Sequence, residues 1–289
     1  MTLTIFTPAF NRAATLPRLY ESLRDQTCYD FEWLIIDDGS TDDTARIVGQ
    51  YIQEKAFPVR YYWKENGGKH TAYNMALEMA SGKWFYCVDS DDFLVPDAVE
   101  RLAAVTQTLN QQQGIVAYKK DTAETLLSGR FPEGVRFSKF NELVMRYGCK
   151  GEFSLIFPSE LARRFPFPVF SGERFVTESV VYDRISPECE MRLLPQVITV
   201  CEYQDDGYSQ NANMVMARNP GGFCLYFMQR IDLMPSFLSK VVCAGKYWCF
   251  RWISQNKTLH YAGKHRLICG LGWPVGLIFR VYYKVVRGF

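Results

Sequence analysis

The chain has 289 residues, of which 48% are hydrophobic and 22% are charged, and its formal net charge is +2. This balance is typical of a globular protein with a large core, built as one large domain or as one domain with an appendage, and it excludes a disordered chain. Nine cysteines without a C-x-x-C pair predict thiols in a reducing compartment. The first residues, MTLTIFTPAF, indicate a strand rather than a signal peptide, and no apolar run reaches the roughly 18 residues of a spanning helix.

The charge is distributed unevenly along the chain. From Leu233 to the end there are nine basic residues and no acidic one. Residues 1–232 hold the other 24 of the 33 basic residues against all 31 acidic ones, a formal charge of −7. Such a split predicts that the C-terminal part meets an anionic surface.

The first hundred residues alternate between short apolar runs, which indicate buried strands, and segments with apolar residues at helical spacing. Thr15 is the candidate N-cap of the first helix, with Pro17 in its first turn. Thr41 or Asp42 is the candidate N-cap of the second helix, and Gly82 is expected to end the third. Four strands alternating with helices predict an α/β fold with a doubly wound, mostly parallel sheet. The expected strands are 3–7, 31–36, 59–63 and 84–88, and the expected helices are 14–23, 44–52, 71–80 and 96–109.

Three of these four strands end in polar clusters. Residues 7–12 follow the first strand, Asp37 and Asp38 follow the second, and residues 89–92 follow the fourth. Carboxyl ends of parallel strands meet at the edge of the sheet where ligands bind, so we expect the clusters to face one crevice. Neighbouring carboxylates repel one another unless a cation or a proton neutralises them, and a hard divalent cation suits such oxygen ligands. The alternative is a solvated turn in which Asp89 or Ser90 caps the next helix.

A glycine-rich loop precedes the third helix. It consists of Asn66, Gly67, Gly68 and Lys69. Free amides and the dipole at a helix N-terminus attract anions, glycines allow close approach, and Lys69 adds a positive charge. Beside the carboxylates, this loop predicts a nucleotide-diphosphate ligand. It does not match the Walker A pattern, so an ordinary turn is the alternative.

Four motifs, TPAFNR, IIDDGSTDDT, NGGKHTAYN and YCVDSDD, occur in this order over residues 3–110. Together they resemble the N-terminal half of glycosyltransferase family 2, the inverting group with a GT-A fold, and in particular bacterial polysaccharide-type members. The resemblance implies a nucleotide-sugar donor, with a UDP-sugar expected. The donor-binding residues that it implies are Thr7, Pro8, Phe10, Asn11, Asp37, Asp38, Asn66, Lys69, Asp89 and Ser90.

The resemblance also implies that Asp89, Ser90 and Asp91 form the D-x-D motif. Asp91 would bind Mg²⁺ or Mn²⁺ together with Asp89, which also lies towards the ribose or sugar, and Asp92 would be structural. Many family members have Arg at the position of Tyr73, and here we expect Lys69 to supply that positive charge.

An acid in the second half of such proteins opens a helix, faces the acceptor and precedes an Arg by six residues. Glu178 stands six residues before Arg184, so the resemblance implies that Glu178 is the catalytic base. Thr177 and Ser179 depart from the usual pair of acids. Glu173 is the competing acid, and for either residue the structural alternative is a helix N-terminal acid stabilised by the dipole.

The second half predicts further strands at 115–118, 151–157 and 197–203, a short helix at 160–164 capped by Ser159, and loops at 121–140, 205–209 and 218–220. We expect a GT-A catalytic domain over 1–215, with a nucleotide-binding half (1–110) and an acceptor half (111–215). A basic, aromatic, helical C-terminal region is expected over 216–289.

The C-terminal region interleaves aromatic residues with Lys and Arg at 241–253 and 267–286. Its longest apolar run, 267–279, is interrupted by glycines and a proline and is too short to span a bilayer. Aromatic anchors with basic residues and no acids predict a segment lying in the interface of an anionic membrane. The alternative is a helical pair that packs on the catalytic domain with a solvated basic face. No nucleic-acid-binding motif accompanies the charge.

The sequence therefore predicts a metal-dependent inverting glycosyltransferase of cell-surface polysaccharide synthesis. It would be cytoplasmic, peripheral on the inner face of the cell membrane, and would use a saccharide or lipid-linked saccharide acceptor. Glu178 would act as general base. One alternative is a nucleotidyltransferase, which would need a glycine-rich basic loop after the first strand, where residues 7–12 have no Gly. The other is a catalytically silent nucleotide- or glycan-binding module, which would not need three clustered carboxylates.

Overall fold

The structure is a computed structural model that describes residues 2–202, 212–254, 256 and 258–287. The chain divides into two compact units. The first comprises Met1–Pro166 and Arg184–Gln204, and the second comprises Phe167–Asp183 and Asp205–Phe289. The segment 167–183, expected in the acceptor half of the catalytic domain, thus groups with the C-terminal helices, while the functional boundary at residue 215 remains a prediction. The loop expected at 205–209 lies outside the described residues.

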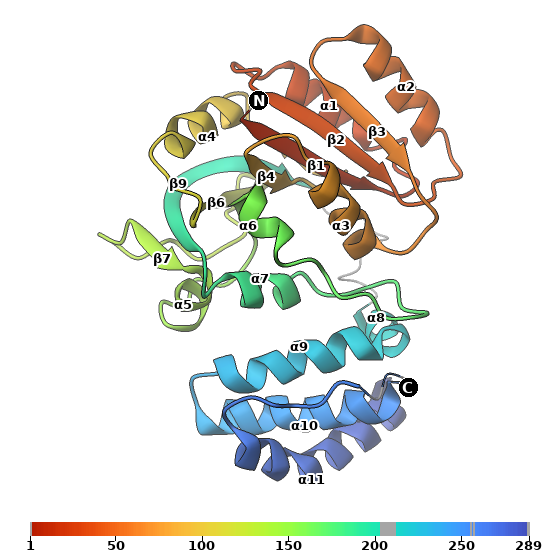
Figure 1. Cartoon of the computed structure of the whole chain (residues 1–289), viewed down its shortest axis with the longest axis vertical. Helices are drawn as coiled ribbons and strands as arrows, with labels where there is room; N and C mark the ends of the chain where they lie inside the picture. The colour runs from red at the N-terminus through yellow and green to blue at the C-terminus, as the bar shows by residue number, and fades with distance from the viewer. Residues whose placement is uncertain (1, 203–211, 255, 257, 288–289) are drawn as a thin grey trace. The chain divides into compact units, whose positions relative to one another are not determined.

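The described part of the first unit contains one nine-stranded sheet with the order β3-β2-β1-β4-β8-β6-β9-β5, and β7 pairs with β9 (Figure 1). The neighbours from β3 to β4 are parallel, β8 is antiparallel to both β4 and β6, and β9 is parallel to β6. This confirms the α/β class with a doubly wound first half. The strands are β1 (Leu3–Ala9), β2 (Phe31–Asp37), β3 (Val59–Trp63), β4 (Trp84–Cys87), β5 (Phe93–Leu94), β6 (Gln113–Asp121), β7 (Phe137–Lys139), β8 (Phe153–Pro158) and β9 (Glu190–Cys201).

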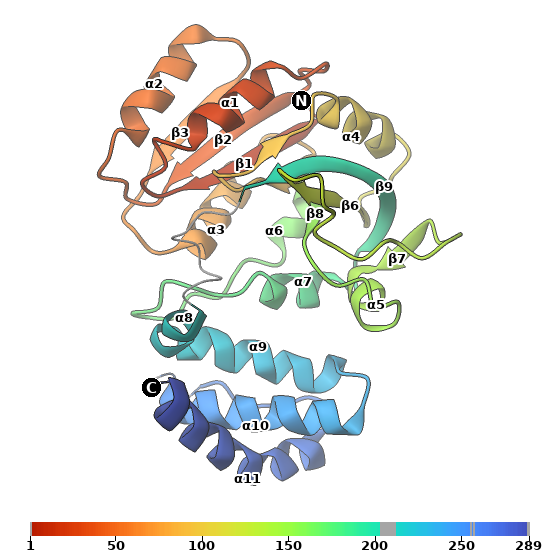
Figure 2. The same cartoon turned by 180° about the vertical axis from the view of Figure 1, so that it is seen from behind.

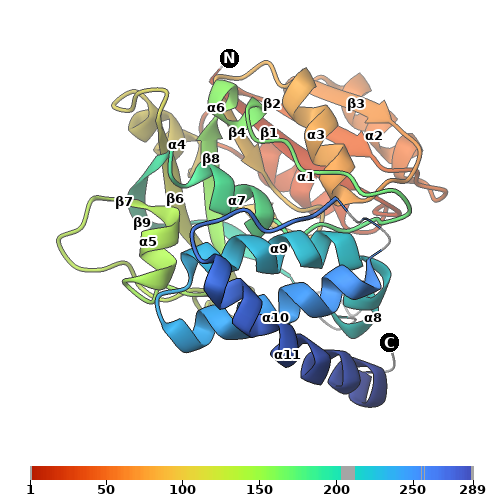
Figure 3. The same ribbon diagram turned by 60° about the horizontal axis from the view of Figure 1, so that its bottom comes forward.

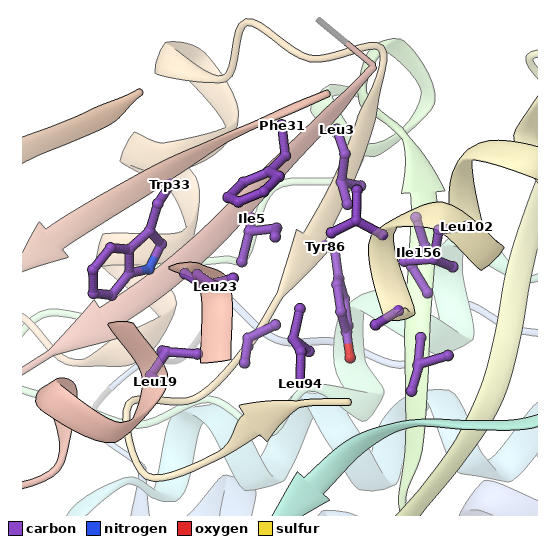
Figure 4. Close-up of a cluster of buried hydrophobic side chains, with 14 of the residues drawn as sticks. Leu3, Ile5, Leu19, Leu23, Phe31, Trp33, Tyr86, Leu94, Leu102 and Ile156 are labelled. Carbon is purple, nitrogen blue, oxygen red and sulfur yellow. The ribbon is translucent and has the colours of Figure 1, made fainter. Parts of the chain in front are cut away.

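Helices cover both faces of the first half of this sheet. Because side chains alternate along a strand, Leu3 and Ile5 of β1 pack with the buried residues of α1, α2 and α4, as Figure 4 shows for part of this core. Phe6 points to the opposite face, where its ring lies 5.8 Å from that of Tyr73 in α3. Figure 2 shows α1, α2 and α4 on the near side of the sheet. The helices of this unit are α1 (Leu16–Arg24), α2 (Thr44–Glu54), α3 (Lys69–Met79), α4 (Ala98–Thr106), α5 (Phe140–Met145) and α6 (Ser159–Arg163).

Several element boundaries differ from the expectation. The loop expected at 121–140 contains β7, and β5 is an additional strand of two residues that pairs with β9. Both strands depend on pairing with distant residues, which leaves no local pattern. Thr15 is the N-cap of α1 but makes no side-chain cap, and α2 is capped at Asp43 rather than Thr41 or Asp42. Asp42, which directly precedes the N-cap residue, accepts a hydrogen bond from the Thr44 amide (3.0 Å).

The second unit contains helices, with its own core formed by α9, α10 and α11, which lie side by side in Figure 3. Glycines bring α10 and α11 close together: a Cβ on Gly272 would lie 2.3 Å from Cβ of Ala244, and one on Gly276 would lie 2.8 Å from Cβ of Trp248. No described helix has the length and apolar content needed to cross a membrane. The elements are α7 (Ser179–Ile185), whose last two residues belong to the first unit, α8 (Ala212–Arg218), α9 (Pro220–Leu233), α10 (Phe237–Ile253), α11 (Arg266–Tyr282) and the π-helical turn η1 (Tyr283–Arg287).

Candidate active site

The strand order places a topological switch point between β1 and β4. The chain winds from β1 through β2 to β3 on one side, and then returns to β4 on the other side of β1. Ligands bind at such points, outside the carboxyl ends of the strands. The loops that follow β1, β2 and β4 all leave the sheet at this edge. The structure therefore brings the three predicted polar clusters together.

Asp37, the last residue of β2, and Asp38, which follows it, are buried and engaged in hydrogen bonds. Asp37 accepts hydrogen bonds from the Ser40 amide (2.7 Å) and from the Tyr61 hydroxyl (2.6 Å). Burial, followed by this bond to Asp37, raises the pKa of Tyr61. Since the Tyr61 hydroxyl stays protonated, Asp37 holds the turn after β2 in place against β3.

Asp38 holds the glycine-rich loop. Its Oδ1 accepts from Lys64 Nζ (2.6 Å) and the Gly67 amide (2.9 Å), and its Oδ2 accepts from the Gly68 amide (2.7 Å). Gly68 has φ +93°, a conformation that favours glycine. The expectation of free amides on this loop is thus wrong for Gly67 and Gly68. The loop does bind an anion, but that anion is the Asp38 carboxylate.

The loop after β1 is fastened to the turn after β2. The Asn11 amide donates to Ser40 Oγ (2.8 Å), and Asn11 Oδ1 accepts from the Thr41 amide (2.8 Å). Thr7 is buried and accepts from Trp33 Nε1 (2.9 Å), so its side chain belongs to the core. Only the backbone of Thr7 is therefore available to contact a bound nucleotide sugar. Phe10 is 46% exposed, which leaves its ring available for stacking.

The D-x-D segment begins one residue after Val88, whose amide donates to Phe6 O of β1 (2.9 Å). Asp89 Oδ1 lies 2.6 Å from Lys69 Nζ, in the first residue of α3. Burial alone would raise the pKa of Asp89, but the positive charges of Lys69 and Lys119 hold it below its usual value. Asp89 is therefore ionised and balanced by lysine.

Asp92 forms a buried ion pair with Lys119 of β6, with 2.8 Å between Oδ2 and Nζ. Burial alone would lower the pKa of Lys119, but Asp92 outweighs it and raises that pKa well above the usual value. Ser90 is also buried. Asp92 thus anchors the segment, in agreement with the structural role expected for it.

Asp91 differs from its two acidic neighbours. No side chain in the described ranges donates a hydrogen bond to its carboxylate, whereas its backbone oxygen accepts from Arg18 Nη2 (2.9 Å). Burial, and then the charges of Asp89 and Asp92, raise the pKa of Asp91. A carboxylate with a raised pKa and no side-chain donor is typical of a ligand-binding position.

The residues of this segment fit a divalent metal only together with a ligand. Within the described ranges, no group of three or more His, Cys, Asp or Glu side chains is placed to hold a metal ion. Mg²⁺ is usually held by one or two carboxylates together with substrate phosphates and water. Asp91 and Asp89 are the two carboxylates that could do so here, since burial and then the charges of Asp89 and Asp92 raise the pKa of Asp91, and a bound cation would offset both effects.

The two candidate bases belong to the second unit. Glu173 accepts the amides of Gly221 (2.6 Å) and Gly222 (2.9 Å), one on each carboxylate oxygen. It therefore caps the N-terminus of α9. Glu178 is half-buried and directly precedes α7, where its backbone oxygen accepts from the amides of Val181 and Tyr182 (both 3.0 Å). Its catalytic role remains a prediction.

Three contacts of this site were missed from the sequence: Lys64 on Asp38, Tyr61 on Asp37, and Lys119 on Asp92. Lys64 directly follows β3, so the rule that ligating residues follow strands could have found it. Lys119 could not be found in this way, because nothing local places β6 near β4. Tyr73, at the position where many relatives have Arg, packs its ring 5.1 Å from that of Phe85. It is a core residue here.

Comparisons with known proteins identify the family of the chain. A family model described as glycosyl transferase family 2 matches residues 4–168, more than half of the chain. The chain belongs to glycosyltransferase family 2.

Curated relatives match about a third of the chain. The chain is 42% identical over 97 residues to chondroitin synthase from Escherichia coli, covering 34% of this chain and 14% of that protein. It is 40% identical over 97 residues to hyaluronan synthase from Pasteurella multocida, covering 34% and 10%. The match thus spans a small fraction of these relatives' length.

Solved structures share the fold over nearly the whole chain. S. aureus TarS 1-349 in complex with UDP-GlcNAc has a TM-score of 0.63 at 16% identity, covering 98% of this chain and 81% of that chain. The mannosyltransferase PcManGT from Pyrobaculum calidifontis, in complex with GDP-Man and Mn²⁺, has a TM-score of 0.56 at 18% identity, covering 99% and 82%. At these identities the likeness concerns the fold, and it confirms the expected GT-A-like architecture.

Proposed function

We propose that this family 2 glycosyltransferase moves a sugar, with inversion, from a nucleotide-diphosphate donor to a saccharide or lipid-linked saccharide acceptor in cell-surface polysaccharide synthesis. The observation that carries the proposal is the convergence of Lys69, Asp89 and Asp91 at the β1/β4 switch point. The relatives named as synthases and the TarS complex with UDP-GlcNAc support a UDP-sugar as donor.

The donor's nucleoside would lie over the loops that follow β1 and β2. Phe10 offers an exposed ring for the base, Asn11 belongs to the same loop, and Pro8 lies in β1 directly before it. Asp37 and Asp38 would act largely by holding the turn after β2 and the Asn66 loop in position, because their oxygens already accept bonds from the protein. The nucleoside would thus meet a preorganised surface.

The diphosphate would lie between the N-terminus of α3 and the D-x-D segment. Asp91 and Asp89 would hold Mg²⁺ or Mn²⁺, which when bound neutralises charge on the departing diphosphate. Lys69 would then leave Asp89 and turn to a phosphate oxygen. This exchange keeps each charge paired, because the carboxylate that Lys69 balances in the free protein is one of those proposed to hold the cation.

Glu178 would take the proton from an acceptor hydroxyl as general base. The acceptor oxygen would attack the anomeric carbon in line, so the new glycosidic bond forms as the bond to the diphosphate breaks, with inversion. Glu173 is engaged on both oxygens by α9, which supports Glu178 in this role.

We place this reaction on the inner face of the cell membrane, with the protein bound peripherally through its C-terminal region. The acid-free sequence after Asp232 supports this location, and a lipid-linked acceptor would explain it. We assign catalysis to residues 1–215.

Titration calorimetry with a panel of UDP- and GDP-sugars, each with Mn²⁺ and with EDTA, tests the proposal. We expect one donor to bind in a Mn²⁺-dependent manner and to be slowly hydrolysed. Donor binding without hydrolysis or transfer to any saccharide would favour a silent binding module. Absence of binding by every sugar nucleotide, in a protein that melts cooperatively, would overturn the assignment of the site.

A further inference from the structure

Helix α11 turns its apolar side outward. Its most buried residues, Cys269, Gly272 and Gly276, face the close contact with α10. The side chains that share the opposite side form what we name the apolar face of α11. These are Leu267 (86% exposed), Leu271 (54%), Leu277 (45%), Ile278 (69%) and Val281 (62%). Trp273 (48% exposed) lies at the edge of this face, with its ring 5.8 Å from that of Trp252 in α10.

This arrangement reverses the usual pattern of a surface helix, which buries its apolar stripe and exposes polar residues. The apolar face spans four turns and has no charged residue between Arg266 and Arg280. Phe237 and Leu238, at the start of α10, are also exposed (61% and 71%). Exposed apolar area of this extent marks an interaction surface rather than scattered surface residues.

Basic residues lie at both ends of the apolar face. Lys264 and Arg266 are exposed at its beginning, and Lys284 is exposed beyond its end. Arg266 is in the first turn of α11, where the helix dipole disfavours a positive charge, so the helix itself does not account for it. The nearby acid Asp232 already accepts from the Tyr261 hydroxyl (2.7 Å) and the Lys264 amide (3.1 Å).

We propose that the apolar face of α11 lies in the plane of an anionic lipid bilayer, with its leucines, Ile278 and Val281 among the acyl chains and Lys264, Arg266 and Lys284 on the lipid phosphates. An amphipathic helix of this composition binds at the interface rather than across it. A helix of 17 residues is about 26 Å long, so it covers several headgroups when it lies flat. The inference deepens the proposed function, which places the enzyme on a membrane, by naming the surface and its partner.

A second copy of the chain fits this face less well. From residue 233 onwards the sequence has nine basic residues and no acid, so two such faces in contact would bring like charges together. Anionic lipid supplies the opposite charge to the basic residues at both ends of the face. Charge complementarity therefore selects the bilayer.

Co-flotation of the full-length protein with vesicles tests the inference without donor or acceptor, so its outcome is separate from that of sugar transfer. We expect binding to vesicles of phosphatidylcholine mixed with phosphatidylglycerol, and little binding to phosphatidylcholine alone. The double variant Leu271→Asn/Ile278→Asn is expected to bind at least about tenfold more weakly, because two anchors are lost. Arg266→Gln and Lys284→Gln should each weaken binding about fivefold.

Val169→Asn is the matched control, since Val169 is 62% exposed in the same unit but not on α11. It should float like the wild type, and all variants should keep the wild-type melting temperature because the changed side chains are exposed. Wild-type protein that fails to float, or a double variant that floats like the wild type, overturns the inference. A dimer in sedimentation that the double variant dissociates, without vesicle binding, would instead make this face an interface between copies.

Discussion

The ammonium group of Lys69, the first residue of α3, lies 2.6 Å from Oδ1 of Asp89, two residues beyond β4. A helix N-terminus with its lysine and a strand end with its carboxylates thus meet before any ligand binds. This pair balances the carboxylate that we propose for metal binding, and it predicts how the free site responds to pH.

We expect Lys69→Met to destabilise the free protein at neutral pH by no more than about 1 kcal/mol, because the pair is partly exposed. The pKa of Asp89 is lowered in the folded state, so its contribution to stability is present at neutral pH and is lost as the pH falls through that lowered pKa. The deficit of the variant should therefore shrink on acidification in urea unfolding followed from pH 7 to pH 3. Lys83→Met, which changes an exposed lysine before the other end of β4, is the control and should show no such trend.

Asp91→Asn is expected to stabilise the free protein while it abolishes Mn²⁺-dependent donor binding. Burial and the charges of Asp89 and Asp92 raise the pKa of Asp91, so the ionised carboxylate is unfavourable in the fold at neutral pH. An amide of the same shape removes that repulsion, with a gain of roughly 0.5–1 kcal/mol. Thermal melting and calorimetry with a UDP-sugar and Mn²⁺ measure the two effects. A variant that loses stability, or that still binds donor only with Mn²⁺, contradicts this role.

Asp92→Asn should have the opposite effect on stability. Asp92 and Lys119 form a buried pair at 2.8 Å, and Asn would leave the Lys119 ammonium buried beside a neutral group. Breaking one side of such a pair typically costs about 3 kcal/mol. The double variant Asp92→Leu/Lys119→Met removes both charges and should recover most of this loss in urea unfolding. If Asp92→Asn proves as stable as the wild type, Asp92 is not the anchor of the D-x-D segment.

Much of the fold was predictable from local pattern. Buried apolar runs that end in polar residues predicted β1 to β4. Their alternation with helices predicted that these strands are parallel. The order β8-β6-β9-β5 was not predictable, because β5 has two residues and owes its existence to pairing with Val200 and Thr199. Such long-range pairs leave no periodicity in the sequence.

The part of the candidate site that follows the strands or belongs to a motif was predictable. Strand ends and motifs identified Asp37, Asp38 and the D-x-D segment at one edge of the sheet. They could not show that the Asp38 carboxylate accepts hydrogen bonds from the amides of Gly67 and Gly68. Every residue type except proline has a backbone amide, so no sequence pattern reveals such a bond. The sequence offered a helix N-terminal acid as the structural alternative for Glu173, but it could not show which helix, because the partners are main-chain amides of α9 some fifty positions later.

That capping role separates the two candidate bases experimentally. Glu178→Gln should lower the transfer rate by roughly 10²–10⁴-fold, because an amide cannot accept the acceptor's proton, while donor affinity stays unchanged. Glu173→Gln should instead destabilise the protein by about 1 kcal/mol, because one of the amides of Gly221 and Gly222 would then face an NH2 group in place of an acceptor oxygen. Burial raises the pKa of Glu173, so the loss of its charge contributes little to this cost.

Single-turnover transfer rates, measured well below the melting transition of each variant, distinguish the two roles. At that temperature Glu173→Gln should transfer sugar at close to the wild-type rate. A fall in kcat with Glu173→Gln, together with full activity of Glu178→Gln, would exchange the assignments. It would also mean that Glu173 leaves the amides of Gly221 and Gly222 when the acceptor binds, and amide hydrogen exchange at the start of α9 would then increase upon acceptor addition.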